Sequence, residues 1–521
     1  MRRPAPLRPQ ALRRHLSTLL LAFAATLALA APAAFARNRD TLGADDVAWL
    51  RRDGFGLDSA SVARYRELGR DRYLDAQLDD KLGDELPPAI DQLIHGYEVV
   101  NTPPDQLIAS FQAEQQRIKD MPDGDAKVDA RKALQQHGND LLQQAQQAAL
   151  LRAVYGSNQL KEQMVWFWLN HFSLYGAKGR VRWVAARFAE ESVRPHALGK
   201  FKDLVMATLK SPAMLEYLDN AQNAKGHVNE NYARELMELH TLGVGSGYTQ
   251  QDVQQLALIL TGVGIAPPAD KQRINPKMAA QYVRDGLFEF NPMRHDFGDK
   301  VLLGTTIKGG GFDEVEKAVD LIVRQPACAT FVSTSLAKYF VADNPPPSLI
   351  TAMAKTFRHT DGDIAAVMET MLTSKEFTAS LGKRYKDPTQ FLVSTMRLAY
   401  DGKPVENPRP LVNWINQLGQ APFGRITPDG WPSTDSEWSS SGQIAKRFEI
   451  ARAIGSGANH LFDLDEDGTR SVGGFPQLTT PTYYATIEPS LGPKTRNALS
   501  QATSQQEWNT FLLASPEFNY R

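Results

Sequence analysis

Residues 229–243, NENYARELMELHTLG, have the pattern of one amphipathic helix with a signal at each end. At about 100° per residue, the charged side chains fall on one face and the apolar side chains on the other. Asn229 can accept hydrogen bonds from the free N–H groups of the first turn, and Gly243 tolerates the positive φ that follows many helices. The stretch therefore predicts a helix that packs one face on a core.

The polar face of this helix carries an unusually large number of charged side chains. Glu230, Arg234 and Glu238 follow at i, i+4 and i+8, so one guanidinium can lie between two carboxylates. Glu235 adds a third carboxylate, and His240 falls within the apolar arc. A solvated ladder beside a core histidine explains this pattern, and so does a site for acid–base chemistry or a metal. We keep all five as candidate catalytic residues.

Two more segments contribute candidates. Residues 158–175 contain three aromatic residues in a row, so this helix is expected to be buried on nearly all sides and to form the centre of the core. His171 lies near its end, as polar chemistry at the edge of that core. Arg194 and His196 flank a proline that can begin a further helix. These three residues complete the set of catalytic candidates.

Composition excludes some classes of function. The chain has 521 residues, a formal net charge of −1, 42% hydrophobic residues and 22% charged residues, as in ordinary globular proteins. A nucleic-acid-binding protein normally needs a basic surface, so no nucleic-acid partner is expected. Cys328 is the only cysteine, which excludes a disulfide within the chain, and its apolar neighbours indicate a core position.

The first 36 residues have the pattern of a signal peptide. A basic start precedes an apolar run at 19–30 and the tripeptide AFA at 34–36, which fits a cleavage site. The apolar run is shorter than the about 20 residues that cross a membrane, so no transmembrane anchor is expected after cleavage. We predict an exported protein, periplasmic or secreted. Arg13 and Arg14 loosely resemble a twin-arginine signal, so both export routes stay open.

After the signal peptide, the chain divides into an N-terminal helical segment at 43–150 and a helical core at 151–521, which are expected to form one body. The Gln-rich residues 104–149 predict two long helices joined at a Pro-Asp-Gly-Asp turn. The least helical stretch lies at 265–311, and apolar and polar residues alternate within it at 281–290. The predicted fold class is mainly α, a multi-helix orthogonal bundle with at most a small β-hairpin around 270–310.

Two features of the C-terminal third indicate ligands. Trp431 and Trp438 lie in a loop rich in Gly, Pro and Ser, where an aromatic ring can stack on a sugar or another flat ligand or can anchor the loop. Asp463, Asp465 and Asp467 match the opening of a calcium loop, but the bidentate Glu of its last position is missing. We keep the two tryptophans as candidate ligand contacts and the three aspartates as candidate calcium ligands. No other cofactor is implied.

Several motifs along the chain occur together in one known family. They are WLNHF at 168–172, RPH at 194–196, SPAM at 211–214, NENYARE at 229–235, HDFG at 295–298, GWP at 430–432 and SPEF at 515–518. In this combination the sequence resembles the DUF1800 family of bacterial proteins over nearly the whole mature chain. The resemblance is most specific in the middle of the chain and weak in the Gln-rich region and around Asp463.

The resemblance implies a mainly helical exported protein and assigns no reaction to it. Members of the family are often encoded beside a second exported family, DUF1501, whose members resemble sulfatases and alkaline phosphatases. The resemblance therefore implies a DUF1501-like exported protein as a partner.

Two functions from different classes fit these observations. One is a non-catalytic scaffold or assembly factor, in which Glu230, Arg234 and Glu238 form a buried network that fixes the packing of their helix. The other is a hydrolase-like enzyme that uses the Glu, Arg and His side chains for metal or acid–base chemistry. The chain has no His-Glu-x-x-His, Gly-x-Ser-x-Gly or phosphate-loop motif. The spacing of the polar residues implies no reaction, so we favour the scaffold.

Overall fold

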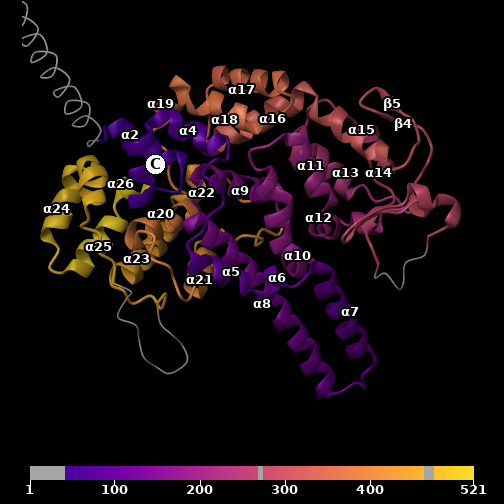
Figure 1. Cartoon of the computed structure of the whole chain (residues 1–521), viewed down its shortest axis with the longest axis horizontal. Helices are drawn as coiled ribbons and strands as arrows, with labels where there is room; N and C mark the ends of the chain where they lie inside the picture. The colour runs from indigo at the N-terminus through magenta and orange to yellow at the C-terminus, as the bar shows by residue number, and fades with distance from the viewer. Residues whose placement is uncertain (1–41, 268–273, 463–474) are drawn as a thin grey trace, which may run out of the picture.

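A computed structural model describes residues 42–267, 274–462 and 475–521 of the protein. Helices dominate this part of the chain (Figure 1), which confirms the mainly α fold class. The expected signal peptide at 1–36 and the calcium-like Asp463, Asp465 and Asp467 lie outside the described residues. No helix in the described ranges is both long and apolar enough to cross a membrane.

The N-terminal segment ends in a long helical hairpin. The helices before it are α2 (Ala44–Asp53), α3 (Ser59–Leu68), α4 (Arg70–Leu78), α5 (Pro88–His95) and α6 (Glu98–Asn101). The hairpin consists of α7 (Pro104–Asp120) and α8 (Asp125–Tyr155), and it projects from the body (Figure 1). The two long helices predicted for the Gln-rich region are therefore confirmed. Residue 150 lies within α8. The division of the chain at that residue stays a prediction.

The central helix is α9 (Gln159–His171), which begins where the Asn158 side chain accepts a hydrogen bond from the Lys161 N–H group. Ten of its residues are buried, which confirms the expected core helix. The next helical elements are α10 (Val181–Arg187), η1 (Phe188–Val193), η2 (Arg194–His196), α11 (Phe201–Lys210), α12 (Pro212–Tyr217), η3 (Asn220–Gln222), α13 (Asn231–Glu235), η4 (Leu236–Thr241) and α14 (Gln250–Ile259). The helix expected at Pro195 is only the single 3-10 turn η2.

Among the described residues, the strands are five short segments in two sheets, more than the one hairpin predicted for 270–310. They are β1 (Val263–Ile265), β2 (Val283–Asp285), β3 (Phe288–Phe290), β4 (Lys300–Leu302) and β5 (Thr305–Ile307). The antiparallel order β1-β3-β2 places Phe290 opposite both Val263 and Val283. The β4–β5 hairpin turns at Leu303 and Gly304, both at positive φ. Two short turns lie in this region, η6 (Pro276–Gln281) and η7 (Pro292–Arg294).

Helices resume after the strands. They are α15 (Phe312–Val323), α16 (Pro326–Phe340), α17 (Pro347–His359), α18 (Ile364–Leu372), α19 (Lys375–Ser380), α20 (Pro388–Tyr400), α21 (Arg409–Gln417), α22 (Asp435–Trp438), α23 (Ser441–Gly455), η9 (Tyr483–Ile487), η10 (Glu488–Ser490), α24 (Pro493–Gln501), α25 (Gln505–Leu513) and α26 (Pro516–Asn519). Cys328 lies on α16 with none of its surface exposed, which confirms the expected core position, and burial raises the pKa of its thiol.

The apolar side chains form two core clusters. The first cluster draws on α2 to α4, α6 to α19 and the strands, whereas the second draws on α5, the end of α8, α20, α21 and α23 to α26. Residues from 43–150 contribute to both clusters. The long α8 and the central α9 therefore hold the two clusters together.

The beginning and the end of the described chain meet between these clusters (Figure 1). Tyr520 forms an antiparallel bridge with Tyr385, just before α20. Arg52 of α2 is fully buried and donates hydrogen bonds to the carbonyl oxygens of Phe340, Ser380 and Arg521. One guanidinium thus joins α2 to carbonyl groups that lie 288 to 469 residues further along the chain.

Candidate functional site

The helix predicted at 229–243 is interrupted by a change of geometry. Asn229 accepts a hydrogen bond from the Asn231 N–H group at 2.9 Å, but the α-helix itself covers only Asn231–Glu235. The following element, η4, is a π-helix. The Thr241 hydroxyl fills its widened turn by donating to the Leu236 carbonyl at 2.6 Å. Gly243 has the predicted positive φ of 87°. The prediction of a single α-helix is therefore wrong for its second half, Leu236–Thr241. A π-turn holds more residues than an α-turn, so the assumed 100° per residue does not apply there.

The charged ladder on this helix is present, but it is not buried. Arg234 contacts Glu230 at 3.0 Å and Glu238 at 3.4 Å, and it donates to Gln250 at 2.8 Å. The side chains of Glu230, Arg234 and Glu238 expose 34%, 35% and 25% of their surfaces. The expected buried network is therefore wrong, because the start of α14 covers this face only in part. Glu235 is half-buried, and its burial followed by the charge of Glu238 raises its pKa.

His240 and His171 lie side by side at the inner face of η4. His240 has no exposed surface, and neither of its ring nitrogens has a hydrogen-bond partner among the described residues. The Nε2 atom of His171 is 2.9 Å from the carbonyl oxygen of His240, and Phe172 packs against the His240 ring. Burial lowers the pKa of His171 to about 4 and that of His240 to about 3. Both rings are therefore neutral near pH 7.

A buried ion pair is found at another candidate, Arg194. Its guanidinium makes two hydrogen bonds to the Glu162 carboxylate, at 2.6 and 3.1 Å. Arg194 and Glu162 expose only 7% and 4% of their side chains. Burial by itself would lower the pKa of Arg194, but the larger effect of the Glu162 carboxylate raises this pKa. His196 is half-buried on η2, where burial lowers its pKa. The ion pair joins α9 to η2, which sequence reasoning missed because it did not consider Glu162.

A second buried network surrounds Glu314, which was not among the candidates. Its carboxylate lies 2.9 Å from His295 Nε2 and 2.7 Å from Lys300 Nζ, and all three side chains are at most 1% exposed. Backbone N–H groups of Gly310 and Gly311 also donate to it. Although burial alone would raise it, these hydrogen bonds lower the pKa of Glu314 to about 2. In the sequence, only the HDFG motif, which contains His295, pointed to this network.

The eight catalytic candidates thus do not converge on one site. The ladder occupies a partly exposed face, the two neighbouring histidines face the core, and Arg194 and His196 belong to η2. Within the described residues, no group of three or more His, Cys, Asp or Glu side chains is arranged to hold a metal ion.

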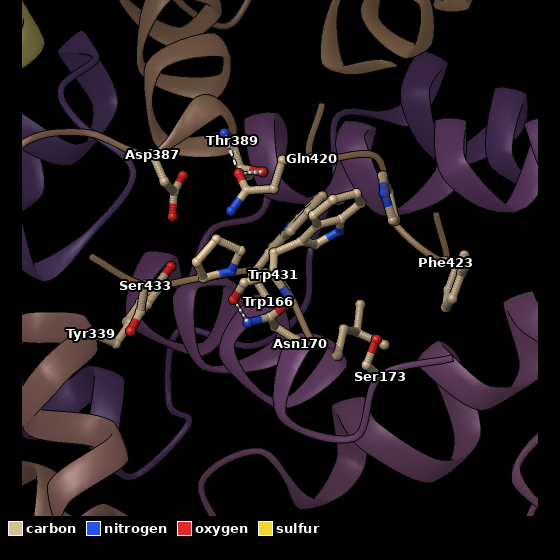
Figure 2. Close-up of a pocket in the computed structure, with 13 residues that line it drawn as sticks. Trp166, Asn170, Ser173, Tyr339, Asp387, Thr389, Gln420, Phe423, Trp431 and Ser433 are labelled. Carbon is tan, nitrogen blue, oxygen red and sulfur yellow. Dashed lines mark hydrogen bonds between the residues drawn. The ribbon is translucent and has the colours of Figure 1, made fainter. Parts of the chain in front are cut away.

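A cleft opens where α9, the start of α20 and the loop before α22 meet (Figure 2). Its space, including the part open to solvent, is about 570 Å³. Aromatic and polar side chains from three distant parts of the sequence line it, chiefly Trp166, Asn170, Asp387, Thr389, Gln420 and Trp431. Two motifs noted in the sequence, WLNHF and GWP, therefore meet at this cleft.

Two hydrogen bonds join Asn170 to the loop that carries Trp431 (Figure 2). Its amide nitrogen donates to the Trp431 carbonyl at 2.9 Å, and its amide oxygen accepts from the Trp431 N–H group at 2.7 Å. Gly430 has a φ of 75°, and a Cβ atom there would lie 2.3 Å from the Asn170 carbonyl oxygen. The loop can therefore approach α9 so closely only with glycine at this position.

The two candidate tryptophans have different roles. Trp431 is half-buried, lines the cleft and donates from its indole nitrogen to the Ala421 carbonyl at 3.2 Å. Trp438 is only 6% exposed and donates to the Pro432 carbonyl at 2.9 Å, which anchors the loop. Of the two, only Trp431 offers a ring surface to the cleft.

Asp387 is the one carboxylate among the residues that line the cleft. It caps α20, where its Oδ1 atom accepts from the Gln390 N–H group at 2.8 Å. Burial raises its pKa, although the Gln390 N–H group and the charges of Arg521 and Arg447 act in the opposite direction. A capping pattern, Asp-Pro-Thr-Gln, is visible at residues 387–390, but such a pattern does not distinguish a structural cap from a site residue.

The fold and the cleft define a mainly α protein whose motif residues meet between two core clusters. The model of the family described as "Protein of unknown function (DUF1800)" matches residues 48–520. The chain therefore belongs to the DUF1800 family, which confirms the resemblance seen in its motifs. The comparisons with curated proteins and with solved structures found no match.

Proposed function

We propose that the protein is an exported, non-catalytic scaffold or assembly factor that holds a partner protein. The observation that supports this function best is how the motif side chains are used. Asn170 is bonded to the Trp431 backbone, Arg194 to Glu162, and His171 to the His240 backbone. Each contact fixes one segment against another, which is what a rigid binding frame requires.

The partner that we propose is a DUF1501-like exported protein, as the family resemblance implies. The proposed export rests on the sequence pattern of residues 1–36. Intact-mass analysis of protein from the cell envelope tests it: a mature chain that begins near Arg37 supports export, and a chain that retains Met1 contradicts it.

Co-expression tests the scaffold. The chain is produced with a DUF1501-like exported protein, and size-exclusion chromatography with light scattering measures whether a complex survives. A stable complex supports the scaffold, provided that the Asn170→Ala variant weakens the complex and lowers the melting temperature together. The absence of a complex, combined with turnover of an ester, phosphate, sulfate or glycoside by the purified chain, would reverse the assignment.

A second function, an acid–base hydrolase, is supported by one observation, the half-buried Asp387 carboxylate with its raised pKa in the cleft. Asp387→Asn separates the two functions, because Asn caps a helix about as well as Asp but transfers no proton. For a scaffold, the variant keeps both its melting temperature and the complex. Loss of a measured turnover at an unchanged melting temperature would instead identify Asp387 as catalytic.

A further inference from the structure

A large groove runs between α7, α8 and the start of α10, along the hairpin that projects from the body in Figure 1. Its space, including the part open to solvent, is about 1400 Å³. Its apolar floor consists of the half-buried Leu134 and the edges of three core side chains, Phe111, Ile118 and Trp183, which expose 8%, 5% and 3% of their surfaces. The rings of Phe111 and Trp183 pack with their centres 4.3 Å apart, so this floor is a continuous packed surface.

The rim of the groove is cationic. Five basic side chains line it, whereas Glu216 is the only carboxylate, and that carboxylate is held by Arg180 at 2.6 Å. Lys119, Arg131 and Arg182 have no carboxylate within 4.0 Å among the described residues. Burial lowers the pKa of Arg182, which lacks the counter-ion that would offset it. Arg182 instead donates to Asn139 and to the Ala177 carbonyl, and Lys127 pairs with Asp123. The positive charge without a carboxylate partner in the described structure therefore lies mainly on Lys119 and Arg131.

The spacing along the helices sets the length of the groove. On α7, Phe111 and Ile118 are seven residues apart, which corresponds to roughly 10 Å at 1.5 Å per residue. On α8, Lys127 and Arg131 follow at i and i+4 on the facing ridge. Two turns of a further helix have a matching length.

We propose that this groove docks an acidic amphipathic helix of a partner protein. The apolar face of that helix covers the floor at Phe111 and Trp183, and its carboxylates pair with Lys119, Arg131 and Arg182. A helix in an apolar groove is a common mode of recognition, with charges on the rim selecting the partner. The whole chain has a net charge of −1, so attraction to acidic peptides has to come from the groove itself.

This inference rests on the proposed scaffold function and names the kind of segment that the scaffold holds. A synthetic probe tests it without the natural partner. The probe is a fluorescein-labelled amphipathic helix of Leu, Ala and Glu, about four turns long, and its binding to the full mature chain is followed by fluorescence anisotropy near physiological salt. One control peptide has Lys in place of Glu, and another has Ser in place of Leu. The acidic peptide with its leucines is expected to bind at least about tenfold more tightly than either control.

Charge reversal locates the binding. The Lys119→Glu/Arg131→Glu variant changes the rim, and the matched Arg117→Glu/Lys132→Glu variant makes the same charge change on the same two helices outside the groove. Arg117 and Lys132 expose 57% and 73% of their side chains, so the control substitutions do not disturb packing. We expect the rim variant to weaken the acidic peptide at least about tenfold and the control to change its affinity by less than about threefold.

Four results would overturn the inference. The first is equal weakening by the two variants, which would mean long-range attraction only. The second is equal binding of the acidic and basic peptides. The third is rim-dependent binding to phosphatidylglycerol vesicles without binding of the peptide, which would make the groove a lipid contact. If the rim variant still forms the complex with the DUF1501-like protein, the groove inference fails while the scaffold function stands.

Discussion

Two glycines with nearly the same φ show how much stability depends on the close contact between Asn170 and the Trp431 loop. Gly430 and Gly419 have φ values of 75° and 77°, but only Gly430 faces neighbouring atoms. Gly419→Ala should cost about 1–2 kcal/mol of unfolding free energy, the strain of a left-handed residue. Gly430→Ala should cost several kcal/mol more, because its Cβ atom meets α9. Urea denaturation measures both, and equal costs would show that the loop moves away freely.

His240 gives the protein a defined sensitivity to acid. Its pKa is lowered to about 3 in the folded state, against about 6.5 in an unfolded chain, so the unfolded state binds more protons between these values. Stability is therefore complete above about pH 6.5 and falls as the pH decreases toward 3, by at most about 1.4 kcal/mol per pH unit from this residue. We expect His240→Leu to flatten the dependence of unfolding free energy on pH between 7 and 4.5.

If His240→Leu leaves the slope as steep as in the wild type, the ring of His240 takes up its proton without unfolding the chain, and the pKa assigned to it is wrong.

At the scale of elements, two arginines on helical segments are expected to differ strongly. Arg194→Ala leaves the Glu162 carboxylate unpaired and buried, which should cost about 3–5 kcal/mol. Arg234→Ala removes a partly exposed ladder and should cost less than about 1 kcal/mol. Urea denaturation provides both values. The double variant Arg194→Met/Glu162→Met should regain most of the loss, whereas a double variant as unstable as Arg194→Ala would mean that packing, and not charge, dominates there.

The elements also show how far sequence patterns reach. The hairpin of α7 and α8, the central α9 and the apolar position of His240 were predicted, because local periodicity and capping residues determine them. The π-turn η4 was not predicted. It depends on the hydrogen bond from the Thr241 hydroxyl to the Leu236 carbonyl, and it leaves the spacing of the apolar residues in the sequence unchanged. The exposure of the Arg234 ladder depends on where α14 packs, which is a tertiary fact.

At the scale of the whole molecule, the cleft was beyond prediction. Its motifs were visible individually, but the contact between Asn170 and Trp431 spans 261 residues, and nothing local in either motif specifies the other. The same holds for the buried pair of Arg194 and Glu162. The mainly α fold class needed only local signals, whereas the site needed pairings between distant segments.

Arg52 tests how the two core clusters are coupled. Arg52→Leu leaves the carbonyl oxygens of Phe340, Ser380 and Arg521 without this donor, and each unsatisfied buried group costs about 1–3 kcal/mol. We expect a lower urea midpoint and faster release of the C-terminal segment by limited proteolysis. The matched Arg72→Leu, at an exposed position on α4, should change neither. Proteolysis as slow as in the wild type would mean that the segment is held without Arg52.

The guanidinium of Arg52 also orders events during synthesis. Arg52 and the carbonyl that it binds at Arg521 are 469 residues apart, so a ribosome adding about 5–20 residues per second takes roughly 20–100 s between them. Throughout that interval α2 has emerged, but one of its buried contacts does not yet exist. The nascent chain therefore cannot close its fold around α2 until Arg521 has been added, which leaves a long window for chaperones to act on an open polypeptide.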